Sequence, residues 1–134
     1  DIKLTDMSQS DLTFCQKAVK NYNRLKTVIL DGDMYRLVSP YSGNHASTMF
    51  VNTNKTKAVL FAFDMNPRYN EHLLPVVMQG LDENKQYSVK EINRYNEGDH
   101  TVGTFSGQYL MTVGINAFSH SHLSSRVYEI NTIQ

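Results

Sequence analysis

Few residues of this chain have the type and spacing that catalysis or metal binding requires. His120 and His122 would share one face of a strand, but the pair has no evident third ligand or acidic partner, so a loop is preferred. Ser106 lies in the segment GTFSG at 103–107, one position later than the nucleophile of the Gly-x-Ser-x-Gly hydrolase turn. We therefore predict a turn between two strands there, with no helix after it. The glycines do not have the spacing of a phosphate-binding loop.

Asp31 and Asp33 come nearest to the paired carboxylates of a glycosidase, which lie about 5–5.5 Å apart in a retaining enzyme. Their place after a predicted helix favours capping and turn formation instead. The chain has no tryptophan, and Tyr41, Tyr69 and Tyr95 fall in predicted loops, where exposed rings can stack on a sugar. From the residues alone we expect no catalytic, cofactor-binding or metal-binding residue, and no cofactor.

Three further features have an ordinary structural interpretation. Cys15 is the only cysteine, which excludes an intrachain disulfide. It lies within the apolar pattern of a predicted helix, which indicates a small core residue rather than a reactive thiolate. Asn54 begins a glycosylation sequon whose residues are also those of a hairpin turn. Four basic side chains are predicted to form a solvated helix face, with contact to an acidic partner as the alternative: Lys17, Lys20, Arg24 and Lys26.

Length and charge restrict the classes of function. The 134 residues fit one domain that can bury a core without disulfides. Lys plus Arg number 13 and Asp plus Glu number 13, so the net charge of zero gives no general attraction to nucleic acid or anionic lipid. The longest apolar run, 58–63, is far shorter than the ~20 residues of a membrane helix, and we find no signal sequence. Neither a nucleic-acid nor a membrane partner is expected.

The first part of the chain has the periodicity of one helix. Apolar residues recur three or four apart at Leu12, Cys15, Val19, Tyr22, Leu25, Val28 and Ile29. Ser8 or Ser10 is the expected N-cap, and Gly32 is expected to end the helix in the left-handed conformation. Phe14 and Ala18 widen the apolar face, so the helix needs more cover than one small sheet gives. We assign residues 1–31 to this helical segment.

Residues 32–134 have the pattern of an antiparallel β-sandwich of about eight strands. Short β-rich runs separated by turns leave no room for crossover helices. The predicted strands are Tyr35–Ser39, Ser47–Val51, Ala58–Met65, Pro75–Gln79, Gln86–Asn93, Thr101–Ser106, Gln108–Gly114 and Arg126–Ile133. Alternation supports two of them directly, since Tyr87 and Val89 share one face and Tyr109 and Met111 share another. The expected fold is mainly β, preceded by one N-terminal α-helix.

Several segments, in this order and spacing, resemble the end of family 36 glycoside hydrolases, the bacterial α-galactosidases. The helix that starts DLTFCQKA at 11–18, with YRLVSP at 35–40, is similar to the junction between barrel and tail in that family. AVLFAF at 58–63, GLD at 80–82 and FSGQYLM at 105–111 are similar to strands of its C-terminal domain. The resemblance covers nearly the whole chain.

The resemblance implies a parent enzyme with a (β/α)8 barrel that hydrolyses terminal α-galactosides with retention, using two barrel aspartates. Barrel active sites lie at the C-terminal face of the strands, so those aspartates would lie before residue 1. The resemblance therefore implies a non-catalytic C-terminal domain with a structural or oligomer-contact role, and residues 1–31 would be the last barrel helix. Its partners would be its own catalytic barrel and, through that helix, another copy.

Two other functions stay open on the sequence. A freestanding carbohydrate-binding module is the main alternative, supported by the predicted sandwich and the loop tyrosines. A pure interaction domain, with the helix as its contact surface, is the third. For the parent protein, bacterial cytoplasm and periplasm are both compatible with the sequence.

Overall fold

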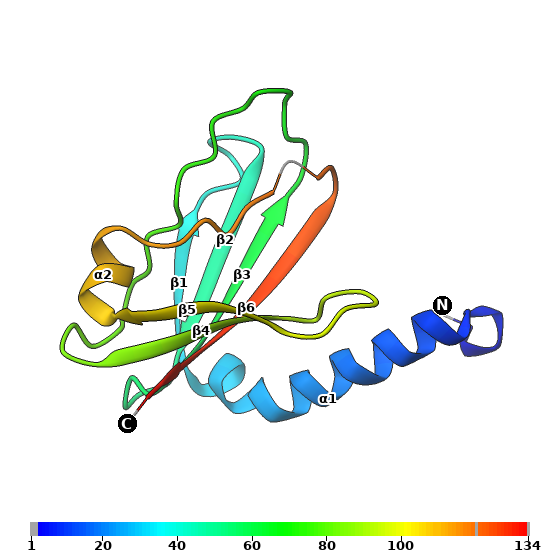
Figure 1. Cartoon of the computed structure of the whole chain (residues 1–134), viewed down its shortest axis with the longest axis horizontal. Helices are drawn as coiled ribbons and strands as arrows, with labels where there is room; N and C mark the ends of the chain where they lie inside the picture. The colour runs from blue at the N-terminus through cyan, green and yellow to red at the C-terminus, as the bar shows by residue number, and fades with distance from the viewer. Residues whose placement is uncertain (1–2, 120, 134) are drawn as a thin grey trace.

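The computed structural model describes residues 3–119 and 121–133, and its main element is one antiparallel sheet (Figure 1). Within those residues the sheet has six strands in the order β1-β2-β3-β6-β4-β5. The strands are β1 (Asp33–Val38), β2 (His45–Val51), β3 (Lys57–Asp64), β4 (Gln86–Ile92), β5 (His100–Ser106) and β6 (Ser124–Thr132). Every neighbouring pair is antiparallel, which confirms the predicted mainly β fold.

The hairpin of β2 and β3 sets the register of the sheet centre. Its turn contains the predicted Asn-Lys-Thr segment: the Asn52 side-chain carbonyl accepts the backbone N–H groups of Thr56 and Lys57, each at 2.9 Å. Lys55 has a φ of 54°, the left-handed conformation that such tight turns use. At the other end of the same hairpin, His45 pairs with Asp64.

The predicted N-terminal helix is present as α1 (Gln9–Asp31), preceded by a 3-10 turn, η1 (Leu4–Asp6). Ser8 is the N-cap, and its hydroxyl accepts the Asp11 N–H at 3.1 Å. The left-handed conformation expected for Gly32 is wrong, because its φ is −86° and its ψ is 166°. The glycine is needed for space: a Cβ there would lie 2.3 Å from the Val28 carbonyl oxygen and 2.7 Å from that of Val51.

The two faces of the sheet are covered differently. On the helix face, Leu25 and Val28 of α1 pack with Val59 and Ile92 of the sheet. On the opposite side, the coil face, the segments 65–85 and 107–118 cover the larger core, which includes Leu60. That core also contains Met49, Val76, Met78, Tyr87, Leu110, Phe118, Tyr128 and Ile130. Neighbouring β3 residues point to opposite faces, as the alternation of a strand requires.

Two of the eight predicted strands are not strands. Pro75–Gln79 is extended, but the described chain pairs it only through an isolated bridge between Val76 and Ile115. Gln108–Gly114 was predicted as a strand and instead contains a short helix, α2 (Gly107–Thr112). The second layer of the domain is therefore built from coil and α2 rather than from a second sheet. No helix in the described part of the chain is long and apolar enough to cross a membrane.

Candidate functional site

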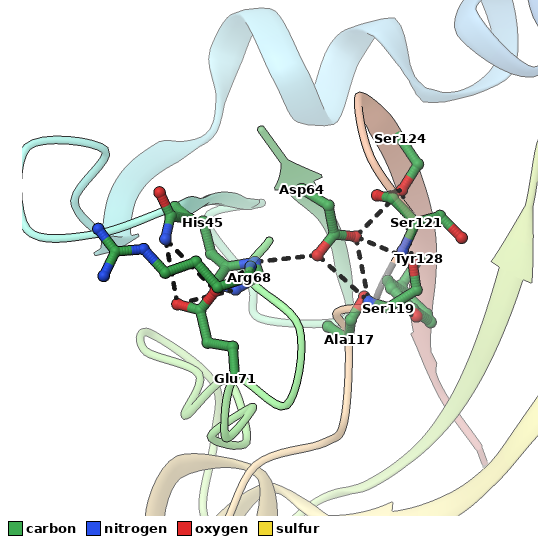
Figure 2. Close-up of polar contacts among 10 residues, drawn as sticks. His45, Asp64, Arg68, Glu71, Ala117, Ser119, Ser121, Ser124 and Tyr128 are labelled. Atoms are coloured by element: carbon green, nitrogen blue, oxygen red, sulfur yellow. Dashed lines mark hydrogen bonds and ion pairs between the residues drawn. The ribbon is translucent and has the colours of Figure 1, made fainter. Parts of the chain in front are cut away.

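The most buried group of polar side chains lies where β2 begins and β3 ends (Figure 2). His45 Nδ1 lies 2.9 Å from an oxygen of Asp64, whose side chain is fully buried. The other carboxylate oxygen of Asp64 accepts the Ser119 N–H at 3.0 Å and the hydroxyls of Ser119 and Ser124 at 3.2 Å. We call these residues, together with Glu71, the His45 cluster. It joins three strands, β2, β3 and β6, to the segment after α2 and to the loop after β3.

Glu71 brings the loop after β3 to the same cluster. Its carboxylate accepts the backbone N–H of Arg68 at 2.8 Å and the side-chain amide of Asn44 at 3.3 Å. The hydrogen bond from Arg68 is the main reason that the pKa of Glu71 lies below its ordinary value, and it outweighs the opposing effect of desolvation. His45 Nε2 is buried and has no hydrogen-bond partner in the described chain; the nearest carboxylate oxygen, from Glu71, is 3.6 Å away.

This arrangement is not a catalytic triad. A serine triad needs a nucleophile hydrogen-bonded to the imidazole nitrogen that faces away from the aspartate. No described residue makes such a bond to His45 Nε2. Asp64 cannot contact a substrate, because its side chain has no exposed surface. Across residues 3–119 and 121–133, no three His, Cys, Asp or Glu side chains lie close enough together to hold a metal ion.

A second polar group holds α1 on the sheet. Arg24 forms an ion pair with Glu129 of β6, whose side chain is only 10% exposed. Burial opposes ionisation of Glu129, but hydrogen bonds from Arg24 and Asn131 outweigh it and hold the pKa of this carboxyl below its usual range. Asn21 donates to the side chain of Asn93 at 2.6 Å. These contacts fix the helix in one position and offer no group for chemistry.

Of the histidine and serine candidates, the structure describes His122 and Ser106. His120 lies outside the described residues, and His122 is exposed. Ser106 is the N-cap of α2, because its hydroxyl accepts the Tyr109 N–H at 3.1 Å. The expectation that no helix follows Ser106 is therefore wrong, while the interpretation of this serine as a local structural residue fits its bond.

The remaining candidates have structural positions. Asp31 and Asp33 are both exposed and flank Gly32 at the junction of α1 and β1. Asn54 lies in the β2–β3 turn and accepts the hydroxyl of Thr56 at 2.8 Å. Cys15 is only half-buried and lines a pocket on the outer side of α1, so its prediction as a core residue is wrong.

The basic residues of α1 do not form one solvated face. Lys20 and Lys26 are exposed, as predicted. Lys17 instead pairs with Asp99 at 2.9 Å, and Arg24 pairs with Glu129. Two of the four basic residues therefore face acidic groups of this same chain.

The three loop tyrosines have different surroundings. Tyr41 is 98% exposed and Tyr69 is 96% exposed. Tyr95 donates its hydroxyl to Asp11 at 2.7 Å and packs edge-on against Phe14, with 5.4 Å between ring centroids. The ring of Tyr95 thus holds the start of α1, and the three tyrosines do not form one platform.

Sequence reasoning did not find the His45 cluster. His45, Asp64 and Glu71 lie far apart in sequence and carry no motif. One signal was present, because the predicted turn after Val51 sets a hairpin register that places His45 opposite Asp64. The predicted second strand began at Ser47, two residues too late to include His45.

Comparison with known proteins agrees with this architecture. The model of the glycosyl hydrolase family 36 C-terminal domain matches residues 45–130. A probable α-galactosidase C from Aspergillus terreus is 36% identical over 104 residues, which cover 78% of this chain and 12% of that protein. α-Galactosidase AgaA from Geobacillus stearothermophilus is 25% identical over 135 residues, covering 100% of this chain and 17% of that protein.

Solved structures show the same fold. AgaA in complex with raffinose superposes with a TM-score of 0.84 at 24% identity, over 98% of this chain and 17% of that one. The α-galactosidase from Lactobacillus brevis has a TM-score of 0.80 at 20% identity, over 100% of this chain and 18% of that one. This chain thus spans less than a fifth of the length of each of these relatives. Since the family model matches well over half of its residues, the chain belongs to the C-terminal domain family of glycosyl hydrolase family 36.

Proposed function

We infer that this chain is a non-catalytic accessory domain of an α-galactosidase-like enzyme, and that it functions by packing against the catalytic barrel of the same polypeptide. The parent would hydrolyse terminal α-galactosides with retention. The observation that supports this role is that α1 has a second apolar stripe, on the side away from the sheet.

The outer stripe of α1 is exposed. Val19 is 59% exposed, Tyr22 49% and Leu30 68%. A shallow pocket of about 530 Å³ lies along it, with Leu12, Cys15 and Val19 in its lining and Leu4 at its rim. Large exposed apolar patches of this kind mark interaction surfaces in soluble proteins. A helix with apolar residues on two sides is typical of one placed between two layers.

We assign residues 1–31 to the last helix of that barrel and residues 32–134 to the accessory domain. The inner stripe of α1 would join the helix to this domain, and the outer stripe would join it to the neighbouring barrel helices. Contact of the outer stripe with a second copy is the competing arrangement.

The state of the buried carboxylates supports a non-catalytic role. A retaining glycosidase needs one carboxylate that can attack a sugar and another that can donate a proton to it. Asp64 is enclosed by His45, Ser119 and Ser124, and Glu129 is paired with Arg24. Neither carboxylate faces open space in which a sugar could bind.

Two measurements test this function. Purified residues 1–134 should not hydrolyse a chromogenic α-galactoside, and turnover above that of a mock preparation would refute the non-catalytic role. In the longer polypeptide that carries this domain, Val19→Ser should lower the thermal midpoint. In residues 1–134 alone it should change the free energy of unfolding by less than about 0.5 kcal/mol.

A matched control distinguishes a buried interface from a general loss of apolar surface. Val102 on the edge strand β5 is 37% exposed, and Val102→Ser makes the same chemical change away from α1. This control should leave the longer polypeptide unchanged. If Val19→Ser also leaves it unchanged while residues 1–134 self-associate through α1, the second-copy arrangement replaces the barrel contact.

A further inference from the structure

The helix face of the sheet is only partly covered by α1. The helix runs from the Gly32 junction, beside the end of β2, to the loop between β4 and β5, so it lies obliquely across the strands (Figure 1). Alternate residues of a strand share a face. The strand registers therefore place four further residues on the same face as Val59: Met34, Arg36, Phe61 and Phe63. We call these four the open area, because Met34 is 50% exposed and Phe63 is 40% exposed.

The apolar flank of α1 faces this open area. Arg24 lies on the other flank, because it pairs with Glu129 of β6 on the side of the helix toward β4 and β5. A helix turns by about 100° per residue, so Tyr22 lies about 160° around α1 from Arg24. Tyr22 is therefore on the flank toward β3, β2 and β1, and Val19 continues this flank outward. Together with the open area, Val19 and Tyr22 form one angled apolar surface, which we call the corner surface.

The sheet on the other side of α1 is polar. The registers of β4, β5 and β6 place there Ser88, Lys90, Thr104 and Asn131. Glu129, which pairs with Arg24, belongs to the same side. The cores of protein interfaces are apolar and are depleted in charged residues. A neighbouring segment is therefore expected on one side of α1 only, over the corner surface.

Arg36 gives the corner surface a positive charge. It is exposed and lies opposite Thr48 of β2 in the strand register. Among the residues that the structure describes, no carboxylate forms an ion pair with it. A guanidinium that an apolar neighbour covers needs a carboxylate, because burying an unpaired charge is costly. The occupant of the corner surface should therefore present a carboxylate at this position.

We propose that a second helix packs alongside α1 on the corner surface, and that it comes from the barrel that precedes α1 in the proposed parent enzyme. Its apolar side would contact Val19, Tyr22 and Phe63, and a carboxylate on it would pair with Arg36. This inference rests on the proposed function, since it takes the barrel as the neighbouring part of the polypeptide. It adds which part of the sheet the barrel meets and the charge it brings there.

Geometry and charge favour a barrel helix over a second copy of this chain as the occupant. The helices of a (β/α)8 barrel form a ring, so each has another helix along its flank, about 8–10 Å away. The corner surface has this position relative to α1, and the single-residue junction at Gly32 holds it over the sheet. In a two-fold dimer the same surface would meet itself. The corner surface has no acidic residue that could pair with Arg36 of another copy.

Met34 gives a test that needs no variant. Its oxidation by peroxide, followed by mass spectrometry, should be at least about tenfold slower in the longer polypeptide than in residues 1–134, because oxidation follows exposure. Met111 of α2, on the coil face, should react at the same rate in both. Equal rates for Met34 would overturn the proposal. Protection of Met34 that disappears on dilution of the longer polypeptide would assign the surface to a second copy and would also overturn it.

Phe63→Thr tests the apolar contact and keeps a β-branched residue in the strand. It should lower the thermal midpoint of the longer polypeptide by at least about 2 °C more than that of residues 1–134. Tyr69→Thr is the control, because it removes an almost fully exposed aromatic ring from the loop after β3. This control should shift both midpoints equally. An equal shift of both midpoints with Phe63→Thr would contradict the contact.

The acidic partner is tested by two changes at Arg36. In the longer polypeptide Arg36→Glu should lower the midpoint more than Arg36→Gln does, because it places two negative charges together. In residues 1–134 the two variants should have similar midpoints. Lys55→Glu makes the same charge reversal at the exposed β2–β3 turn and should have little effect. If Arg36→Glu and Arg36→Gln are equivalent in the longer polypeptide, no carboxylate faces Arg36 and the proposal is wrong.

The failure of this inference can be distinguished from that of the proposed function. If Val19→Ser destabilises the longer polypeptide while Phe63→Thr acts equally on both proteins, α1 packs on the barrel but the open area does not. The accessory role then stands, and the second helix beside α1 is wrong. If neither variant acts specifically on the longer polypeptide, both proposals fail.

Discussion

The two faces of the sheet differ in how they are held. The coil face buries a large apolar cluster in which Leu60, Met49 and Tyr128 are almost fully enclosed. The helix face has four buried apolar residues, Leu25, Val28, Val59 and Ile92, and supplements them with ion pairs and side-chain hydrogen bonds. The coil face therefore supplies most of the hydrophobic stabilisation, because that contribution is roughly proportional to the apolar area buried.

The coil face thus contains the main core of the domain, and α1 is attached to the other face mainly through polar contacts. Polar contacts at a partly exposed surface contribute little to stability but fix geometry well. Lys17, Asn21, Arg24 and Asp11 supply such contacts along most of the length of α1. The helix is thus positioned accurately on the sheet while keeping its outer stripe available.

The largest expected effect comes from the coil face. Leu60→Ala should reduce the free energy of unfolding by about 4 kcal/mol, because Leu60 is fully buried among strands that cannot close around the cavity. Urea denaturation followed by far-UV circular dichroism measures it. The transition should stay cooperative, because this core is shared by the strands of the sheet. A decrease in the free energy of unfolding of less than about 1 kcal/mol would contradict the claim that this face supplies most of the hydrophobic stabilisation.

The same substitution on the helix face should have a smaller effect. Leu25→Ala should cost about 2 kcal/mol, because α1 can shift toward the sheet and fill part of the cavity. Amide hydrogen exchange should become faster in α1, while the amides of the strands should stay protected. If the strands lose protection to the same extent as α1, the two faces form one cooperative unit and the comparison fails.

Acid should weaken the helix face selectively, by less than about 1 kcal/mol. The pKa of Glu129 is lowered in the folded protein, so its contribution is present above about pH 4.5, the ordinary value, and is lost as the pH falls below it. Exchange of α1 amides, corrected for the intrinsic pH effect, should therefore rise in acid before that of β3. Glu129→Gln should remove most of this pH dependence of α1 exchange. If the variant responds to acid as the unmodified protein does, the pH dependence comes from another carboxyl group.

Much of the fold could be predicted from the sequence, because alternation and turn chemistry are local signals. The Asn52–Thr56 turn and the helix cap at Ser8 are examples. Alternation also leads to a wrong prediction at 75–79. Val76 and Met78 are buried and Val77 and Gln79 exposed, so the period of two is real, but the segment lies across the coil face instead of pairing along an edge.

The error at 108–114 has one local cause and one distant cause. Ser106 caps a helical turn, and Gly107 passes so close to the Asp82 carbonyl oxygen that a Cβ would lie 2.0 Å from it. That approach depends on a segment more than twenty residues earlier, which no periodicity reveals. The His45 cluster was missed because its members come from three strands and two loops, and only the folded chain brings them together.

The junction at Gly32 determines how rigidly the sheet is joined to α1. α1 ends at Asp31 and β1 begins at Asp33, so one residue separates helix from sheet, and that residue is wedged between two carbonyl groups. Such a short connection has no flexible residues that could act as a hinge. If α1 is an integral part of the preceding barrel, as proposed, the barrel and this sheet would move as one rigid object, and swinging motions between them would require breaking the helix itself.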